Sequence, residues 1–179
     1  MNVNIKNKFE AVYEVESDAI FRFCLTRVSN REQAMDITQE TFLRLWQSMQ
    51  DDKEILNNRA FIFTIARHLI IDWYRKKKSI SLDSLAHGNK EEEEYDVADN
   101  KTTEVDLFLG VEGRHLVNKI NELSPSYRDP VYLRFVEDLS PGEIGEILGT
   151  SANTASVRIN RGIIELRKIA GYNNDINKK

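Results

Sequence analysis

Cysteine, histidine, proline and glycine are all scarce in this sequence of 179 residues, which contains one Cys, three His, three Pro and eight Gly. A lone cysteine cannot form a disulfide within the chain, and Cys24 lies among apolar residues, so we expect it to be a buried thiol. The histidines are too far apart to match a metal-ligand spacing. The shortage of proline and glycine argues against a turn-rich β-fold.

Long apolar runs and catalytic patterns are missing as well. The first ten residues, MNVNIKNKFE, lack the apolar stretch of a signal peptide, and no run approaches the length of a membrane span. The sequence holds no recognisable Ser-His-Asp set, phosphate-cradling glycine loop or metal-ligand cluster. We therefore expect a cytoplasmic protein that is not an enzyme, with no catalytic residue, metal, cofactor or small-molecule substrate. An enzyme on a helical scaffold remains one alternative.

The net charge is −4, but it is distributed unevenly. Between Asp83 and Asp106, nine acidic residues face only two lysines, so this segment carries −7 and the rest of the chain carries +3. A nucleic-acid-binding face can therefore exist outside the acidic segment. The segment itself reads as a tether that like-charge repulsion keeps extended.

Apolar residues recur every three or four positions before and after the acidic segment, which predicts helices. We expect an all-α chain with two small helical domains, residues 1–78 and 105–179, joined by a flexible acidic linker at 79–104.

Three features describe the first domain. Asn30 is expected to cap a helix, and the apolar positions of that helix are Ala34, Ile37, Leu43 and Trp46. A polar loop follows from Gln47 to Asn58, and then a helix from about Arg59 to Lys78.

The C-terminal domain carries the signals of a helix-turn-helix. Ser140, Pro141 and Glu143 predict a capped helix start, Gly149 a left-handed turn, and Ser151 the start of a second helix. That second helix has apolar positions at Ala155, Ile159, Ile163, Ile164 and Leu166, and it is basic at Arg158, Arg161, Arg167 and Lys168, against Glu165 alone. We expect it to bind duplex DNA; an ordinary helical hairpin is the alternative.

The segment Arg59 to Lys78 mixes aromatic and basic residues. Phe61, Phe63, Trp73 and Tyr74 alternate with Arg59, Arg67, Arg75, Lys76, Lys77 and Lys78, against Asp72 alone. Aromatic faces stack on unpaired bases and cations follow phosphates, so the mixture suits melted DNA. The alternative is that these aromatic residues belong to the core.

Three segments, in this order and spacing, resemble the sigma factors of RNA polymerase. DITQETFLRLWQ (Asp36 to Gln47) resembles D-x-x-Q-E-T-F-x-R-x-W, which binds the polymerase clamp helices, and Arg59 to Lys78 resembles the helix that reads the −10 promoter element. The C-terminal unit resembles L-x-E-I-A-E-I-L-G-x-S-x-x-T-V-K-S-R, which reads the −35 element. With two domains and a linker, the chain resembles the extracytoplasmic-function (ECF) sigma factors.

This resemblance implies roles for individual residues. The clamp would meet Asp36, Gln39, Glu40, Phe42 and Trp46, with part of this set, Trp46 first, expected in the core instead. The loop from about Ser48 to Asn58 would hold a flipped −10 base, and the −10 set comprises Asn57, Asn58, Arg67, His68, Ile71, Arg75 and Lys76. The −35 duplex would meet Asn153, Thr154, Ser156, Arg158 and Arg161.

The implied partners are core RNA polymerase, through its clamp and flap regions, promoter DNA and an anti-sigma factor. The implied function is promoter-specific transcription initiation. The acidic linker would either thread near the polymerase active channel, mimicking nucleic acid, or act only as a tether. A conventional helix-turn-helix regulator, which binds duplex DNA without polymerase, is the alternative for the whole chain.

The sequence also departs from the family patterns. Ser156 and Val157 stand in place of Lys-Ser, which removes one phosphate contact, so we expect weak DNA binding by the isolated unit. Gly145 and Gly162 stand where alanine is usual, and each is expected to cost its helix about 1 kcal/mol relative to alanine. His68 and Phe61 replace Asn and Trp.

Overall fold

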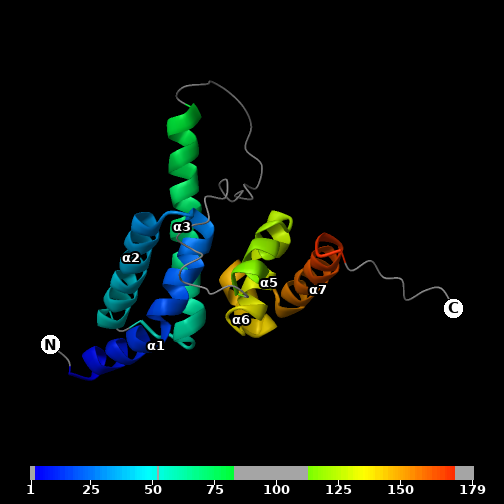
Figure 1. Cartoon of the computed structure of the whole chain (residues 1–179). Helices are drawn as coiled ribbons and strands as arrows, with labels where there is room; N and C mark the ends of the chain where they lie inside the picture. The colour runs from blue at the N-terminus through cyan, green and yellow to red at the C-terminus, as the bar shows by residue number, and fades with distance from the viewer. Residues whose placement is uncertain (1–2, 52, 83–112, 172–179) are drawn as a thin grey trace. The chain divides into compact units, whose positions relative to one another are not determined.

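A computed structural model describes residues 3–51, 53–82 and 113–171, and within these ranges all regular structure is helical. The chain divides into two compact units, Met1–Phe108 (unit 1) and Leu109–Lys179 (unit 2). The helices are α1 Val3–Val28, α2 Arg31–Gln50 and α3 Asn58–Leu82 in unit 1, and α5 Pro125–Phe135, α6 Pro141–Leu148 and α7 Ala152–Ile169 in unit 2, preceded by a helical segment at 113–121 (Figure 1). None of the described helices is long and apolar enough to cross a membrane.

Unit 1 is a bundle in which α1, α2 and α3 pack against one another. Asn30 caps α2 as expected, because its side-chain oxygen accepts a hydrogen bond from the backbone N–H of Gln33 at 2.9 Å. The core side chains include Ile20, Phe23, Leu25, Ile37, Leu45, Ile62, Phe63 and Ile70. The last turns of α3 project beyond α1 and α2 (Figure 1), which leaves their side chains facing solvent up to Lys78.

Cys24 lies inside this bundle with no exposed surface, which confirms the expected buried thiol. Burial raises the pKa of the Cys24 thiol from its ordinary value to about 12, despite a hydrogen bond with Thr38 and the nearby charge of Arg27, which both lower it. The thiol therefore stays protonated at neutral pH, where a thiolate would be needed for reaction.

The ends of α2 and α3 differ from the sequence prediction, whereas α3 begins close to its predicted start. Helix α2 continues to Gln50, so the loop is shorter than the predicted stretch from Gln47 to Asn58. Asn57 caps α3 by accepting a hydrogen bond from the backbone N–H of Ala60 at 3.0 Å. Helix α3 runs to Leu82, so the start of the predicted 79–104 linker is helical, and the remainder of that segment lies outside the described residues.

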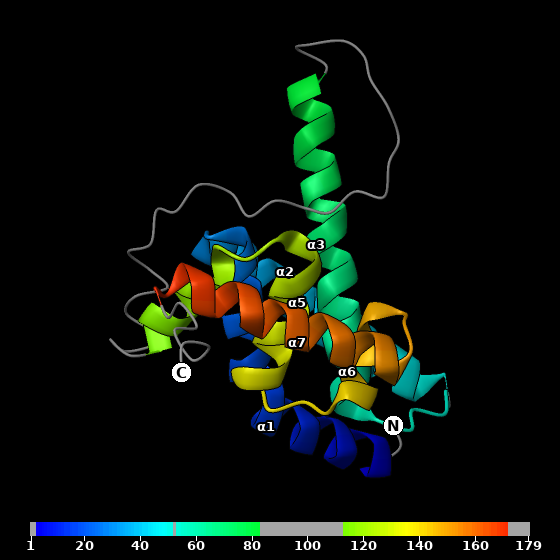
Figure 2. The same cartoon turned by 90° about the vertical axis from the view of Figure 1, so that its right-hand side faces the viewer.

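Unit 2 contains the predicted helix-turn-helix. Ser140 and Glu143 form a capping box at the start of α6: the Ser140 hydroxyl accepts from the Glu143 N–H, and the Glu143 carboxylate accepts from the Ser140 N–H at 2.8 Å. Gly149 closes α6 in the left-handed conformation, with φ of 65°. Ser151 then caps α7, which lies across α5 and α6 (Figure 2).

The two helical glycines have a packing reason that sequence analysis missed. A Cβ atom on Gly162 would lie 2.4 Å from Cγ2 of Val131 and 3.1 Å from Cβ of Tyr127, both on α5. A Cβ on Gly145 would lie 2.9 Å from the carbonyl oxygen of Thr150. The expectation that alanine would be better by about 1 kcal/mol is therefore wrong at both sites, because close helix packing outweighs helix propensity.

Replacing Gly162 by alanine is expected to destabilise unit 2 by about 1–3 kcal/mol, because α7 must move away from Val131 and Tyr127 to admit the methyl group. Hydrogen exchange of the α7 amides in the full chain measures this loss. The matched control is Gly142→Ala, where the nearest atom to a new Cβ is the Ser140 hydroxyl oxygen at 3.8 Å. Equal protection in the wild type and G162A would contradict the packing argument.

Candidate functional site

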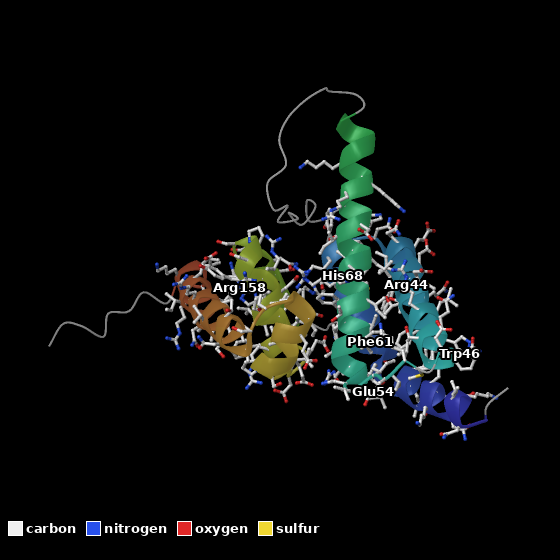
Figure 3. All side chains as sticks on the ribbon, turned by 180° about the vertical axis from the view of Figure 1, so that it is seen from behind. Arg44, Trp46, Glu54, Phe61, His68 and Arg158 are labelled. Atoms are coloured by element: carbon white, nitrogen blue, oxygen red, sulfur yellow. The ribbon has the colours of Figure 1, made fainter. Side chains whose placement is uncertain are left out.

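One face of α2 is largely exposed and carries most of the predicted clamp set. Asp36 and Gln39 are exposed there, and Glu40 is partly exposed and bonded to Arg44, with 2.7 Å between Oε1 and Nε. Leu43 lies on the same face and is 49% exposed. Figure 3 labels Arg44 and Trp46 along α2. The face combines carboxylates, amides and one apolar side chain.

The structure corrects the expectation for the aromatic members of this set. Phe42 is only 3% exposed and packs edge-on against Tyr13, with ring centroids 4.8 Å apart, so it belongs to the core. Trp46, which we expected to be the buried one, is partly exposed and packs against Phe9 at 5.1 Å. Both rings therefore pack against aromatic residues of α1, but only the ring of Phe42 is buried.

A groove of about 400 Å³ lies between α2 and α3 on the surface of unit 1. Asp36 and Glu40 line it from α2, while Arg75 and Lys76 line it from α3. The structure thus brings together residues that sequence analysis assigned to two different partners, the clamp and the −10 strand. The groove has an apolar base that includes Ile37, Leu69 and Trp73. Each rim carries charges of both signs, because Arg44 also lines it from α2 and Asp72 from α3.

The outward face of α3 carries the predicted −10 residues at different depths. His68, Arg75 and Lys76 are exposed, while Arg67 and Ile71 are partly buried. Figure 3 labels Phe61 and His68 on this helix.

The aromatic residues of α3 divide between the core and the surface. Phe63 is fully buried, so the core alternative is correct for it. The rings of Phe61 and Trp73 are partly exposed, and each lies beneath a lysine ammonium, Lys53 and Lys77 respectively, at 5.0 Å from the ring centroid. These cation-covered rings form a surface of the kind that suits single-stranded nucleic acid.

The connection between α2 and α3 borders a second hollow, of about 600 Å³. Lys8 and Val12 of α1 line it together with Lys53 and Ile55 of the connection and Asn58 at the start of α3. Asn57, predicted with Asn58 as a −10 contact, has its side-chain oxygen engaged in capping α3.

Helix α7 presents the predicted −35 residues unequally. Asn153, Thr154 and Arg161 are exposed, whereas Ser156 and Arg158 are partly buried. The Thr154 hydroxyl lies 2.9 Å from the Ser151 hydroxyl, so it takes part in the helix cap. Figure 3 labels Arg158 on α7. The exposed face of α7 therefore offers an amide and a guanidinium that lie outside the cap.

The acidic residue of α7, Glu165, has a structural partner. Its carboxylate accepts hydrogen bonds from the backbone N–H and the hydroxyl of Ser124, at 2.7 and 2.8 Å, at the start of α5. The negative charge of Glu165 therefore lies against the N-terminus of α5, where the helix dipole favours it. The exposed face of α7 keeps the basic character of Arg161 and Lys168.

Two exposed apolar residues were missed as candidates by sequence analysis. Leu43 was assigned to the apolar stripe of its helix, but its side chain points outward from α2. Val157 is 40% exposed on α7, between Asn153 and Arg161 on one face. The spacing could have identified both, because they fall three to four residues from the polar candidates of the same face.

Comparison with known proteins agrees with this division into two units. The family model "Sigma-70 region 2" matches residues 12–80, and "Sigma-70, region 4" matches residues 114–166. Two curated relatives from Bacillus subtilis (strain 168) cover most of the chain. The ECF RNA polymerase sigma factor SigW is 34% identical over 91% of this chain and 89% of its own, and SigX is 25% identical over 92% and 84%.

These matches define a sigma-70-type protein with regions 2 and 4. The chain belongs to the ECF sigma factors of RNA polymerase.

The fold also matches a solved sigma factor, RpoE from Bartonella quintana in complex with the anti-sigma factor NepR. The TM-score is 0.70 at 20% identity, covering 93% of this chain and 99% of that one. The likeness supports the all-α architecture predicted from the sequence.

Proposed function

We propose that this sigma factor binds core RNA polymerase through the outward face of α2 and directs it to promoters with a −10 and a −35 element. The observation that carries this proposal is the composition of the exposed helix faces of unit 1. In unit 1, α2 presents Asp36, Gln39 and Leu43, while the exposed turns of α3 are basic and aromatic. A carboxylate-bearing surface suits a protein partner here, because phosphates would repel it.

The basic face of α3 is proposed to follow the melted −10 strand. Lys76, Lys77 and Lys78 project with the last turns of the helix, and Trp73 offers a ring for stacking. The hollow lined by Lys8, Lys53, Glu54 and Asn58 is large enough for one nucleobase, and its two lysines can attract the phosphates of the DNA strand. Capture of one flipped base there would hold the strands apart.

Helix α7 is proposed to enter the major groove of the −35 duplex, as the second helix of a helix-turn-helix does. Asn153 and Arg161 are exposed on it and supply hydrogen-bond donors for base edges or phosphates. The unit has few such groups, so its affinity alone is low and polymerase supplies the rest by holding both units on one promoter.

The partners of this sigma factor are proposed to include an anti-sigma factor as well as polymerase and promoter DNA. Support comes from the similar fold of RpoE, which was solved in complex with the anti-sigma factor NepR. Such a partner would act by covering the α2 face or the basic faces. The protein itself would carry out no covalent chemistry, and it would act in the cytoplasm beside polymerase.

Selection of genomic fragments distinguishes this function from that of a conventional regulator. Fragments are incubated with the protein, with core polymerase, or with both, and the retained DNA is sequenced. The proposal expects enrichment of one bipartite motif only when both are present. A palindromic motif enriched by the protein alone would instead identify a conventional helix-turn-helix regulator.

A further inference from the structure

Val157 is the one large apolar side chain exposed in the first half of α7. It lies four residues after Asn153 and four before Arg161, so all three side chains share one face of the helix. All three are exposed, with 40% of Val157 open to solvent. Isolated exposed apolar residues are common on protein surfaces, but this one occupies the middle of the candidate DNA-reading face.

We propose that Val157 reads the 5-methyl group of a thymine in the −35 element, which makes it a specificity-determining residue of this sigma factor. The inference rests on the proposed function, because it needs α7 in the major groove. In the major groove, each base pair presents a distinct pattern of hydrogen-bond donors and acceptors, and thymine also exposes its 5-methyl group. An apolar side chain finds its best partner in that groove at this methyl.

The shape and position of the side chain support this assignment. Valine is branched at Cβ, so in a helix it is held almost entirely in one rotamer and its methyl groups have a fixed direction. Recognition helices contact base edges mainly with residues near their N-termini, and Val157 lies in the second turn after the Ser151 cap. Asn153 and Arg161 can form hydrogen bonds with the neighbouring bases or phosphates, which would fix how deeply Val157 enters the groove.

The buried side of α7 does not include Val157. The neighbours on the inner side of α7, Ala155, Ile159 and Gly162, are buried, and Gly162 brings α7 close to α5. Val157 is not one of the buried residues of α7, so it is not a core residue of unit 2. Substitutions at 157 should therefore leave the fold intact.

The test uses the full chain with core polymerase and a promoter recovered by the fragment selection. Each thymine of the −35 region, on either strand, is replaced singly by deoxyuridine, which lacks only the 5-methyl group. At one position the run-off transcript should fall about fourfold with the wild type, the equivalent of one buried methyl group. Val157→Ala should give the reduced level on the thymine template and lose its sensitivity to deoxyuridine at that position.

The matched control is Ile164→Ala, which removes an apolar side chain that is 55% exposed on the same face, further along α7. This variant should keep the deoxyuridine effect. Transcription without any deoxyuridine effect, or an effect that persists undiminished in V157A, would overturn the inference and leave the proposed function standing. Failure to obtain any −35-dependent transcript would overturn both.

Discussion

Replacing Leu43 by aspartate is expected to weaken binding of the protein to core RNA polymerase by about 30-fold or more. Leu43 is the apolar residue at the centre of the outward α2 face, 49% exposed and beside Asp36 and Gln39. A carboxylate there would have to be desolvated in the interface without a partner, which costs far more than the lost apolar contact. Fluorescence anisotropy of the labelled full chain, titrated with core polymerase, measures the change.

The fold of unit 1 should survive this substitution because half of the Leu43 side chain already faces solvent. The control is Val15→Asp, which introduces the same charge at a residue that is 74% exposed on α1. V15D should bind core polymerase as the wild type does. Equal affinities of L43D and V15D for core polymerase would show that the α2 face is not part of the polymerase interface.

Reversing the charge at Arg161 is expected to lower transcription from a −35-dependent promoter by about tenfold or more. Arg161 is exposed on α7, on the same face as Val157, and R161E replaces a donor to DNA with a group that DNA phosphates repel. Binding of core polymerase through unit 1 should be unchanged. Run-off transcription and anisotropy, measured on the same preparation, separate the two effects.

Lys6→Glu supplies the charge-matched control for Arg161. Lys6 lies on α1, and its side chain is 57% exposed and pairs with Glu10 at 3.5 Å. An exposed pair of this kind contributes little to stability, so K6E reverses one charge at little cost to the fold. If K6E and R161E reduced transcription equally, the cause would be the change in overall charge. That result would contradict the role of Arg161 and α7 in recognising the −35 element.

The architecture of unit 2 was predictable from sequence because its signals are local. Ser140, Glu143, Gly149 and Ser151 each fix a helix end through hydrogen bonds or backbone conformation within a few residues. The start of α3 was predicted from the end of the polar loop at Asn57 and Asn58, and the structure shows that Asn57 caps this helix. The end of α2 was not, because no local breaker stands in the predicted loop until Asn57.

The candidate site was less predictable because exposure depends on contacts between helices. Periodicity placed Leu43 in the apolar stripe of its helix, and the family resemblance placed Phe42 at the polymerase clamp. Only the packing of α1 shows that Phe42 is covered and Leu43 is not. The glycines of unit 2 illustrate the same point. Helix propensity alone predicts that alanine would be more stable than Gly162. The close approach of Val131 on α5 leaves no room for the alanine methyl group.

The measurement that tests the central claim most directly is multi-round transcription with purified core polymerase and a library of genomic fragments. Addition of the full chain should yield transcripts that start at fixed positions downstream of one bipartite motif, and L43D should lower their yield at the same protein concentration. Core polymerase that gives the same transcripts with and without the protein would contradict the assignment of α2 to polymerase binding and of α3 and α7 to promoter recognition.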